Sequence, residues 1–513
     1  MQSLDPSSVG NIKLYPEHEV FGEVYDAGKP QLVWHWMSSD LETPVSAYLK
    51  ICGHAPYSFL LESVEGGSTL GRYSIIGTQP DFLWRCKKGA VETRKASDSD
   101  WMPDETEDSI QSLKNALKNS SIDNVPEDLP PMCASGLFGY IGYDMVRLIE
   151  DIPDNNLDDM GVPDSVLMRP SVLVIFDNVK HRICIVTPVY EHAENSSMSA
   201  EDAYNNAKEL IEQVLQSLYA PLDHNLLEHK TSLQPGQNPV SNTDENVYKD
   251  AVKRAKEYIR AGDVFQVVPS QRFSIDYDLP SFELYRSLRS VNPSPFLFHL
   301  SFDGFSLVGS SPEILVRVRD GMVTIRPIAG TRKRGKNLQE DKALEEELLA
   351  DPKERSEHLM LVDLGRNDVG RVAQIGSVEV TEQFQVERYS HVMHIVSNVQ
   401  GRLRDDVDVV DALFAGFPAG TVSGAPKIRA MEIIDELEVS RRATYAGGVG
   451  YFSGRSMDSC IALRTALVKD GKVYVQAGGG VVADSSPDFE HQECRNKAKA
   501  VLYAADLTIK KYS

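Results

Sequence analysis

The second half of the chain is dominated by short apolar runs separated by tight polar turns. Runs of about four to eight residues, rich in branched and aromatic side chains, predict strands. Asp-Gly pairs at 303–304, 320–321 and 470–471 lie between several of them. Asp-Gly is typical of the short turns that join antiparallel strands, so this half predicts hairpins. The predicted strands are 264–269, 296–302, 305–309, 314–318, 322–327, 378–386, 447–452, 460–468 and 472–477.

Helical spacing of apolar residues appears at 200–218 and at 246–261. Two further helices are indicated by their start signals, a capping residue followed by proline. Asp351-Pro352 begins a helix that carries Glu357, and Ser486-Pro487 begins one near the C-terminus. Strand-like runs at 82–85, 171–176 and 182–186 and a helical pattern at 110–117 make the first half a mixture of both structures.

A polar segment at 221–245, with several turn-forming residues, predicts a linker between residues 1–220 and 246–513. Strand follows strand more often than helix follows strand, so no alternating βαβ pattern dominates. The hairpins and the scattered helices therefore predict an α+β fold with largely antiparallel sheets.

Composition adds limits rather than a function. The 513 residues are 42% hydrophobic and 25% charged, as in ordinary globular proteins. A formal net charge of −22 repels phosphate, so nucleic acid is not an expected partner. No run reaches the roughly 18 apolar residues of a membrane helix, and the first residues lack the apolar core of a signal peptide. These patterns predict a cytoplasmic protein without membrane association.

The six cysteines are scattered without a CxxC pair, which favours reduced thiols over disulfides or a zinc site. None lies in the glycine-rich turn that a glutamine amidotransferase nucleophile requires. If glutamine supplies nitrogen to this protein, another chain must hydrolyse it.

Carboxylates on the two proline-started helices are candidate metal ligands. Glu490, Glu493 and Lys497 share one face of the second helix, and Glu357 projects from the first. Mg²⁺ needs only one or two protein carboxylates when water and an anionic substrate complete its shell. From spacing alone, a solvated acidic face remains the simpler explanation.

Three glycine-rich turns could bind an anionic small molecule through exposed backbone N–H groups. They lie at 327–331, 420–427 and 478–480. The second is not a P-loop, because Ile428 stands where a hydroxyl residue would follow the lysine. Each turn could equally be structural, and the same holds for His394 and Arg464 when each is taken singly.

The chain contains the strings LLES at 60–63, FQVVPSQ at 265–271, NPSPF at 292–296, SPE at 311–313, PIAGT at 327–331, EHLMLVD at 357–363 with RND at 366–368, GTVSGAPK at 420–427 and QAGGG at 476–480. Together these strings resemble the large subunits (component I) of anthranilate synthase, within the chorismate-utilising enzymes. The resemblance covers residues 60–497 and is densest after Phe265.

The resemblance implies the fold of that family, two largely antiparallel sheets packed face to face with helices outside. It also implies a lyase that converts chorismate and ammonia to anthranilate and pyruvate with Mg²⁺, as the first step of tryptophan biosynthesis. Glu357 and Glu493 would bind the metal. Glu313 would be the general acid for the departing C4 hydroxyl and His394 would serve pyruvate elimination, with Thr331 as a third catalytic residue. The implied chorismate-binding residues are Gly330, Thr331, Tyr445, Arg464, Gly478, Gly479 and Gly480.

Two positions select among the family's reactions. Relatives that add water carry a lysine where this chain has Gln266, and many that aminate C4 carry a nucleophilic lysine where it has Ala329. The resemblance therefore implies amination at C2. The large subunit of aminodeoxychorismate synthase stays open as an alternative, as does a non-catalytic tryptophan-binding regulator.

The resemblance also implies feedback control. Ser63, Pro295, Phe296 and Leu297 match the family's tryptophan pocket, although the family usually has Tyr-Met in place of Phe296-Leu297. Residues 1–220 would then form a regulatory domain and residues 246–513 the chorismate-binding catalytic domain. Ammonia would come from a separate glutamine amidotransferase subunit, which could contact the first domain.

Overall fold

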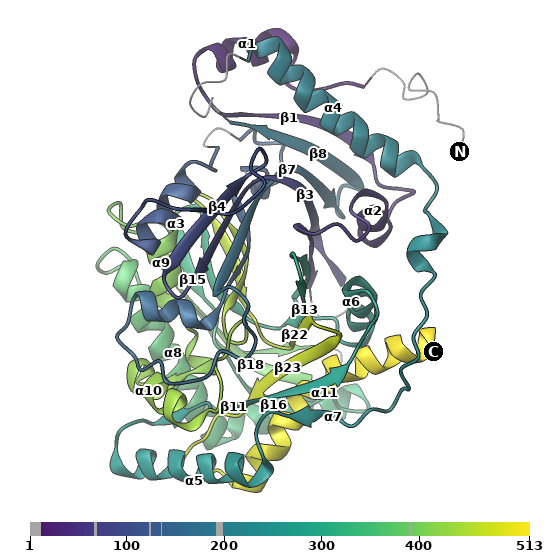
Figure 1. Ribbon diagram of the computed structural model, residues 1–513. Coiled ribbons are helices and arrows are strands. Elements are labelled where there is room, and N and C mark those ends of the chain that lie inside the picture. The colour runs from purple at the N-terminus through teal and green to yellow at the C-terminus, as the bar shows by residue number, and fades with distance from the viewer. Residues whose placement is uncertain (1–11, 66–68, 123–124, 135, 191–197, 390–391) are drawn as a thin grey trace.

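The computed structural model describes residues 12–65, 69–122, 125–134, 136–190, 198–389 and 392–513. Its fold is α+β, with one large network of antiparallel strands and helices on the outside (Figure 1). The network bends into two sheets because β3 (Thr69–Lys87) and β7 (Ser165–Asp177) are long and run through both.

The first sheet is ordered by its hydrogen-bonded neighbours as β1 (Gln31–Ser38), β8 (Arg182–Val189), β7, β3, β2 (Ser58–Glu65), β12 (Phe296–Ser301), β13 (Phe305–Ser311), β22 (Thr465–Lys469), β23 (Lys472–Gly478), β11 (Ser270–Asp276) and β9 (Val240–Ser241).

The second sheet is ordered as β5 (Met102–Pro103), β4 (Ala90–Lys95), β3, β7, β6 (Leu137–Ile141), β20 (Gly448–Phe452), β21 (Met457–Ile461), β14 (Ile314–Arg319), β15 (Met322–Ile325) and β18 (Val392–Arg402). Strand β16 (Ile328–Lys333) continues the edge of β18 beyond β15, and β17 (Glu379–Arg388) pairs with its other edge. A separate small ladder joins β10 (Gln266–Val267) to β19 (Gly424–Ala425).

Alternate strand residues point into different cores, as the period of two requires. Phe59, Phe138 and Phe298 pack between the two sheets. Their neighbours Leu60 and Leu297 pack instead against the helices outside the first sheet. Those helices are α1 (His18–Asp26), α2 (Pro44–Ile51), α4 (Ala200–Tyr219), α6 (Ser281–Val291) and α11 (Pro487–Tyr512).

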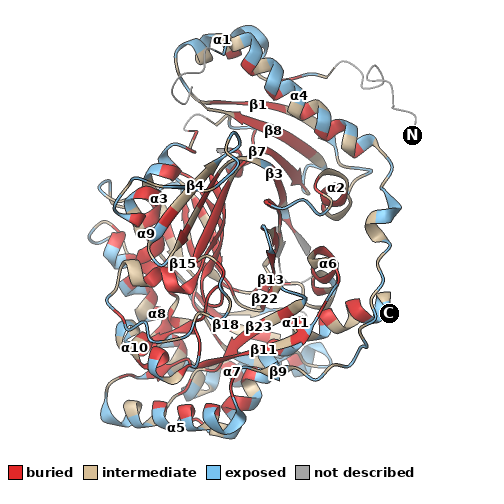
Figure 2. Cartoon of the chain, viewed as in Figure 1, coloured by how far each residue is buried: buried red, intermediate tan, exposed pale blue. Residues whose placement is uncertain are grey.

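A third core lies outside the second sheet, under α3 (Ser109–Lys118), α8 (Pro352–Val372) and α9 (Val409–Gly416). The other helices of the described residues are α5 (Glu245–Ala261), α7 (Leu338–Ala350) and α10 (Lys427–Leu437), with the 3-10 turns η2 (Pro131–Ala134), η3 (Tyr143–Leu148), η4 (His224–Leu227) and η5 (Gly420–Val422). Buried strands therefore lie between outer helices whose free faces are exposed (Figure 2). This arrangement confirms the predicted layered α+β sandwich.

Most predicted elements are found close to their expected bounds. Helices α4, α5, α8 and α11 begin within one residue of the predicted starts. The Asp-Gly pairs at 320–321 and 470–471 have positive φ at both residues, as a tight hairpin turn of this kind requires. Two predicted strands differ: the run at 264–269 forms only the short β10, and the run at 460–468 is broken into β21 and β22.

Residues 221–244 follow the outside of the molecule from α4 to α5, with only η4 and β9 as regular structure (Figure 1). Strands from before and after this segment pair directly, β2 with β12 and β6 with β20. The assignment of 1–220 to regulation and 246–513 to catalysis stays a prediction. Every helix within the described residues is too short or too polar to cross a bilayer.

Candidate functional site

A bulge in strand β16 places Gly330 and Thr331 beside His394 of β18. The β16–β18 ladder shifts register between Ala329 and Thr331, so that Thr331 lies opposite His394. Gly330 has φ +66°, a conformation that glycine adopts without steric cost. The bulge points the Gly330 carbonyl oxygen at His394 Nδ1, 3.0 Å away, and Thr331 Oγ1 lies 3.1 Å from the same nitrogen. Ala329 is buried and lies opposite Ile395.

The contact with Gly330 defines the protonation state of His394. A carbonyl oxygen can only accept a hydrogen bond, so Nδ1 must carry the proton. Nε2 of the neutral ring is then free to accept one. Burial lowers the pKa of His394 to about 4, and the Arg464 charge adds to this, so the imidazole is neutral at neutral pH.

Glu313 is a buried acid in the short connection between β13 and β14. Burial raises its pKa to about 8, although a hydrogen bond from Thr421 and the positive charges of Lys497 and Arg464 oppose the shift. Thr421 Oγ1 donates to Glu313 Oε1 over 3.1 Å. Glu313 is therefore protonated at neutral pH and can donate a proton.

Arg464 occupies the break between β21 and β22. Its φ of +48° is unusual for a residue other than glycine and cannot belong to a strand, which explains why the predicted strand 460–468 is interrupted. Burial lowers the pKa of Arg464, while Tyr389 and Glu313 counteract that shift. Arg464 also influences the pKa values of Glu313 and His394, so one guanidinium lies near both predicted catalytic groups.

Glu357 of α8 faces Gln266 of β10. Helix α8 begins as predicted, with the Asp351 side chain accepting from the backbone N–H groups of its first turn. Gln266 Nε2 donates to Glu357 Oε1 over 3.4 Å. The turn after β23 leaves room for this amide, since a Cβ on Gly480 would lie 2.3 Å from Gln266 Nε2. Burial raises the pKa of Glu357, and the neighbouring Glu354 carboxylate raises it further.

Helix α11 contributes a face of two glutamates and a lysine. Lys497 Nζ lies 2.7 Å from Glu493 Oε1 and donates to the carbonyl oxygen of Gly478 over 2.9 Å. Glu490 is buried, and within the described residues its Oε2 has no hydrogen-bond partner. A Cβ on Gly479 would lie 2.6 Å from that oxygen. Burial raises the pKa of Glu490, and the Glu493 carboxylate adds to the shift.

Lys497 links these parts into one charged region, which also contains Glu313, Glu357, His394 and Arg464. It is called the catalytic cluster below, after the roles predicted for its members. The Lys497 ammonium contacts Glu493 and perturbs the pKa values of Glu313 and Glu357. Tyr445 is buried at the glycine turn, where a Cβ on Gly478 would lie 3.1 Å from its hydroxyl oxygen. The structure thus brings together residues predicted from five separate strings.

Three neighbours of the cluster were not predicted as site residues: Thr421, Tyr389 and Glu354. Thr421 lies in one of the glycine strings, so it had a signal in the sequence. Tyr389 and Glu354 had none, because their importance depends on long-range contacts.

Metal binding would rest on few protein ligands. Across the ranges described above, no group of three or more His, Cys, Asp or Glu side chains is arranged to hold a metal ion. The unpartnered Glu490 oxygen and the raised pKa values of Glu357 and Glu490 nevertheless fit a hard cation, which would relieve the repulsion between carboxylates.

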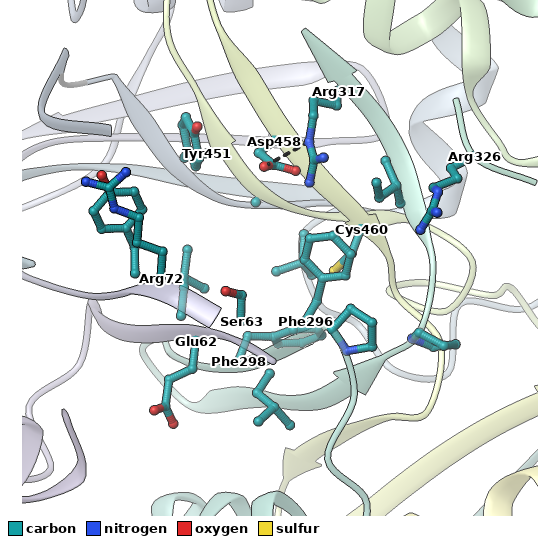
Figure 3. A pocket seen from close by; sticks show the side chains of 18 of the residues that line it. Glu62, Ser63, Arg72, Phe296, Phe298, Arg317, Arg326, Tyr451, Asp458 and Cys460 are labelled. Atoms are coloured by element: carbon teal, nitrogen blue, oxygen red, sulfur yellow. Dashed lines mark hydrogen bonds and ion pairs between the residues drawn. The ribbon is translucent and has the colours of Figure 1, made fainter. Parts of the chain in front are cut away.

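A cavity of about 980 Å³ lies between the sheets, and Ser63, Pro295, Phe296 and Leu297 all line it. Glu387 and Tyr389 line it as well, and the Tyr389 ring contacts His394. Ser63 and Phe296 are opposite each other in the β2–β12 ladder. Figure 3 shows Ser63, Phe296 and Phe298 at this cavity, with Arg317 joined to Asp458 nearby. The predicted regulatory residues are therefore neighbours, although they come from distant parts of the sequence.

The comparisons with known proteins define the class. The family model described as chorismate binding enzyme matches residues 56–503. This match covers most of the chain, which therefore belongs to the family of chorismate binding enzymes.

Within this family, the chain is similar to anthranilate synthase components 1 of several bacteria, which confirms the predicted resemblance. That of Cereibacter sphaeroides is 52% identical over 493 residues, covering 95% of this chain and 97% of that protein. That of Aquifex aeolicus is 47% identical, covering 91% and 93%. The chain is an enzyme by these relationships.

Solved structures agree with the fold. The crystal structure of anthranilate synthase component I from Streptococcus pneumoniae matches with a TM-score of 0.73 and 37% identity, covering 91% of this chain and 99% of that one. The isochorismate synthase MenF of Escherichia coli matches with a TM-score of 0.67, covering 93% and 95%; at 20% identity it supports the fold alone.

Proposed function

We propose that this chain is the chorismate-aminating subunit of an anthranilate synthase, a lyase that opens tryptophan biosynthesis. Chorismate and ammonia would give anthranilate, pyruvate and water. The observation that carries the proposal is Glu313, a buried carboxyl with its pKa raised to about 8, next to the buried Arg464. This pairing provides a proton donor and an anion-binding cation in one place.

In the first step, ammonia adds at C2 of chorismate as the C4 hydroxyl departs. Glu313 protonates that hydroxyl, which needs a carboxylic acid that keeps its proton near neutral pH. Arg464 and the backbone of Gly478–Gly480 bind the substrate carboxylates, with Tyr445, Gly330 and Thr331 completing the wall. Among the described residues no carboxylate forms an ion pair with Arg464, so its guanidinium is suited to a substrate carboxylate.

Glu357 and Glu493 would hold Mg²⁺, with Glu490 and Glu354 close by. When bound, the metal supplies Lewis-acid polarisation of the substrate's ring carboxylate. Lys497 neutralises Glu493 and at the same time donates to the carbonyl oxygen of Gly478, a contact that would remain if Glu493 bound the metal. Glu357 meanwhile accepts a hydrogen bond from Gln266.

In the second step, a base removes the C2 proton of the aminated intermediate while the C3–O bond breaks and enolpyruvate leaves, to become pyruvate. His394 would take this proton, because its Nε2 is unprotonated when Nδ1 donates to the carbonyl oxygen of Gly330. Thr331, on the same ring nitrogen, orients the imidazole.

Gln266 and Ala329 favour amination at C2 over the other reactions of the family. Gln266 cannot activate water as a lysine can, and it is engaged with Glu357. Ala329 cannot form a covalent adduct with the ring. Aminodeoxychorismate synthase component I is the alternative, since this choice depends on two positions.

A glutamine amidotransferase subunit is the proposed ammonia source. The relatives are components 1 of anthranilate synthases, which is consistent with a second component. All six cysteines are buried, and burial raises the pKa of Cys86 and of Cys494 to about 12, which is the opposite of a reactive thiolate.

L-Tryptophan is the proposed inhibitor, bound where Ser63, Pro295, Phe296 and Leu297 line the cavity. The mixture of aromatic, hydroxyl and charged side chains there suits an indole ring joined to an amino-acid group. A rate with ammonia that does not change at saturating tryptophan would reject this assignment. The cytoplasmic location remains a prediction from the sequence.

The decisive experiment uses the purified full chain with chorismate, an ammonium salt and Mg²⁺ at mildly alkaline pH. Anthranilate is identified by its fluorescence and by chromatography against an authentic sample. We expect anthranilate to form with ammonium and its formation to stop with EDTA. A product that retains the enolpyruvyl group and carries nitrogen at C4 would select the alternative, and no consumption of chorismate would reject both.

A further inference from the structure

Tyr389, just beyond the end of β17, contacts the proposed catalytic histidine. The two rings meet edge to face, with centroids 5.6 Å apart and planes inclined by 61°. Such pairs are attractive and prefer a defined orientation. Tyr389 also affects the pKa of Arg464, so its side chain lies beside two members of the catalytic cluster.

The Tyr389 side chain is fixed from its hydroxyl end. Its hydroxyl donates to Glu387 Oε2 over 2.8 Å, and Glu387 forms an ion pair with Arg326 at 2.6 Å. Glu387 lies directly opposite His394 in the β17–β18 ladder. The main chain is fixed as well, because Arg334 donates to the Tyr389 carbonyl oxygen over 2.7 Å. The anchored Tyr389 ring therefore packs against the His394 imidazole from the end of the neighbouring strand.

We propose that Tyr389 is a positioning residue that holds the His394 ring for pyruvate elimination, with Glu387 as the anchor of its hydroxyl. The inference rests on the proposed function of His394. Thr331 and Gly330 fix one edge of the imidazole through Nδ1, but hydrogen bonds at a single atom leave the ring free to tilt. The Tyr389 ring restricts that tilt, which sets the direction of Nε2 toward the substrate.

This role separates the two chemical steps. Addition of ammonia and loss of the C4 hydroxyl use Glu313, whereas only removal of the C2 proton uses His394. Weakening Tyr389 should therefore slow the second step and leave the first nearly unchanged. The aminated intermediate would then leave the enzyme before it becomes aromatic.

The test compares the wild-type chain with Tyr389→Phe, which keeps the ring but loses its anchor, and with Tyr389→Leu, which loses both. Chorismate consumption reports the first step, and chromatography separates anthranilate from the released amino-diene. We expect the ratio of released intermediate to anthranilate to rise about two- to tenfold in Tyr389→Leu and less in Tyr389→Phe. Chorismate consumption should change by less than about twofold.

Tyr258→Phe is the matched control, because Tyr258 also donates to a glutamate, Glu436, over 2.6 Å, but on the exposed side of α5. It should leave the ratio unchanged. In a His394→Ala background, Tyr389→Leu should add nothing to the ratio, since the group that it positions is gone.

An unchanged ratio in both Tyr389 variants would overturn the proposal, and so would an equal loss of both steps or an additive effect on His394→Ala. Failure of the wild-type chain to make anthranilate would instead overturn the proposed function. If Tyr389→Leu does not fold, Tyr389→Phe decides the question, alone and combined with His394→Ala.

Discussion

The catalytic cluster and the cavity between the sheets are both lined by charged side chains, but they hold their charges differently. In the cluster, the pKa of Glu313 is raised to about 8 and that of His394 is lowered to about 4, both mainly by burial. In the cavity, Arg317 pairs with Asp458 at 3.1 Å and Arg326 with Glu387 at 2.6 Å.

This difference suggests two kinds of ligand recognition. The cluster keeps groups in protonation states that water would not favour, which is what proton transfer requires. The cavity balances its charges internally and offers an apolar wall with Phe296, so shape and a few hydrogen bonds would dominate binding there. Variants that disturb chemistry without ligand binding, or the reverse, test this contrast.

The largest effect is expected from Glu313→Gln, which keeps the size of the side chain but removes the transferable proton. Turnover of chorismate should fall about 10²- to 10⁴-fold. Tryptophan binding, measured by calorimetry, should stay unchanged, because Glu313 does not belong to the cavity wall. Weaker tryptophan binding in this variant would mean that the two regions are not independent.

Loss of either proposed metal ligand comes next. Glu357→Gln or Glu493→Gln should lower Mg²⁺-dependent turnover by more than about tenfold, or about 1.4 kcal/mol. Asp363→Asn is the control, since Asp363 lies on α8 as well but pairs with Arg366 at the surface. Titrations of rate against Mg²⁺ would measure the effect. Wild-type turnover in both glutamine variants would reject the ligand assignment.

The pH dependence of the first step should report Glu313. The acid is active only while protonated, so at constant free ammonia the rate should fall as pH rises through about 8. At pH 9 it should be about tenfold below its plateau. A pH profile of chorismate consumption at low substrate concentration measures this limb, which should be missing from the residual rate of Glu313→Gln. A flat profile would contradict a raised pKa.

The smallest effect on rate is expected at the cavity. Ser63→Ala removes one hydroxyl, worth about 1 kcal/mol if it bonds the ligand, so the inhibition constant of tryptophan should rise about fivefold. The uninhibited rate should stay within about twofold. Ser306→Ala on β13, outside the cavity wall described above, serves as the control. Equal inhibition of Ser63→Ala and wild type would remove Ser63 from the proposed site.

Local patterns in the sequence predicted the elements that carry the site better than the contacts within it. Cap-and-proline signals located α8 and α11, and with them Glu357 and Glu493, because those signals act over one turn of helix. The pairing of β2 with β12 joins residues more than 200 positions apart, and no local pattern encodes it.

The break at Arg464 shows the same limit. Apolar residues continue through 460–468, so the run predicts a single strand, and only tertiary packing imposes the positive φ. Tyr389 was missed for a related reason: its contact with the predicted His394 depends on the strand pairing that places Glu387 opposite His394, and no local pattern encodes that pairing.

The pairing of β2 with β12 and of β6 with β20 has a consequence for how the polypeptide can be divided. A cut in the external segment 221–245 would interrupt no ladder except the short β9–β11 contact. If the two pieces were separated, however, each would be left with unpaired strand edges, because β2 pairs with β12 and β6 with β20. A nicked molecule should therefore remain assembled and active. Halves produced separately should each be insoluble alone, and they should regain solubility and activity when they are folded together, because they are two parts of one folding unit.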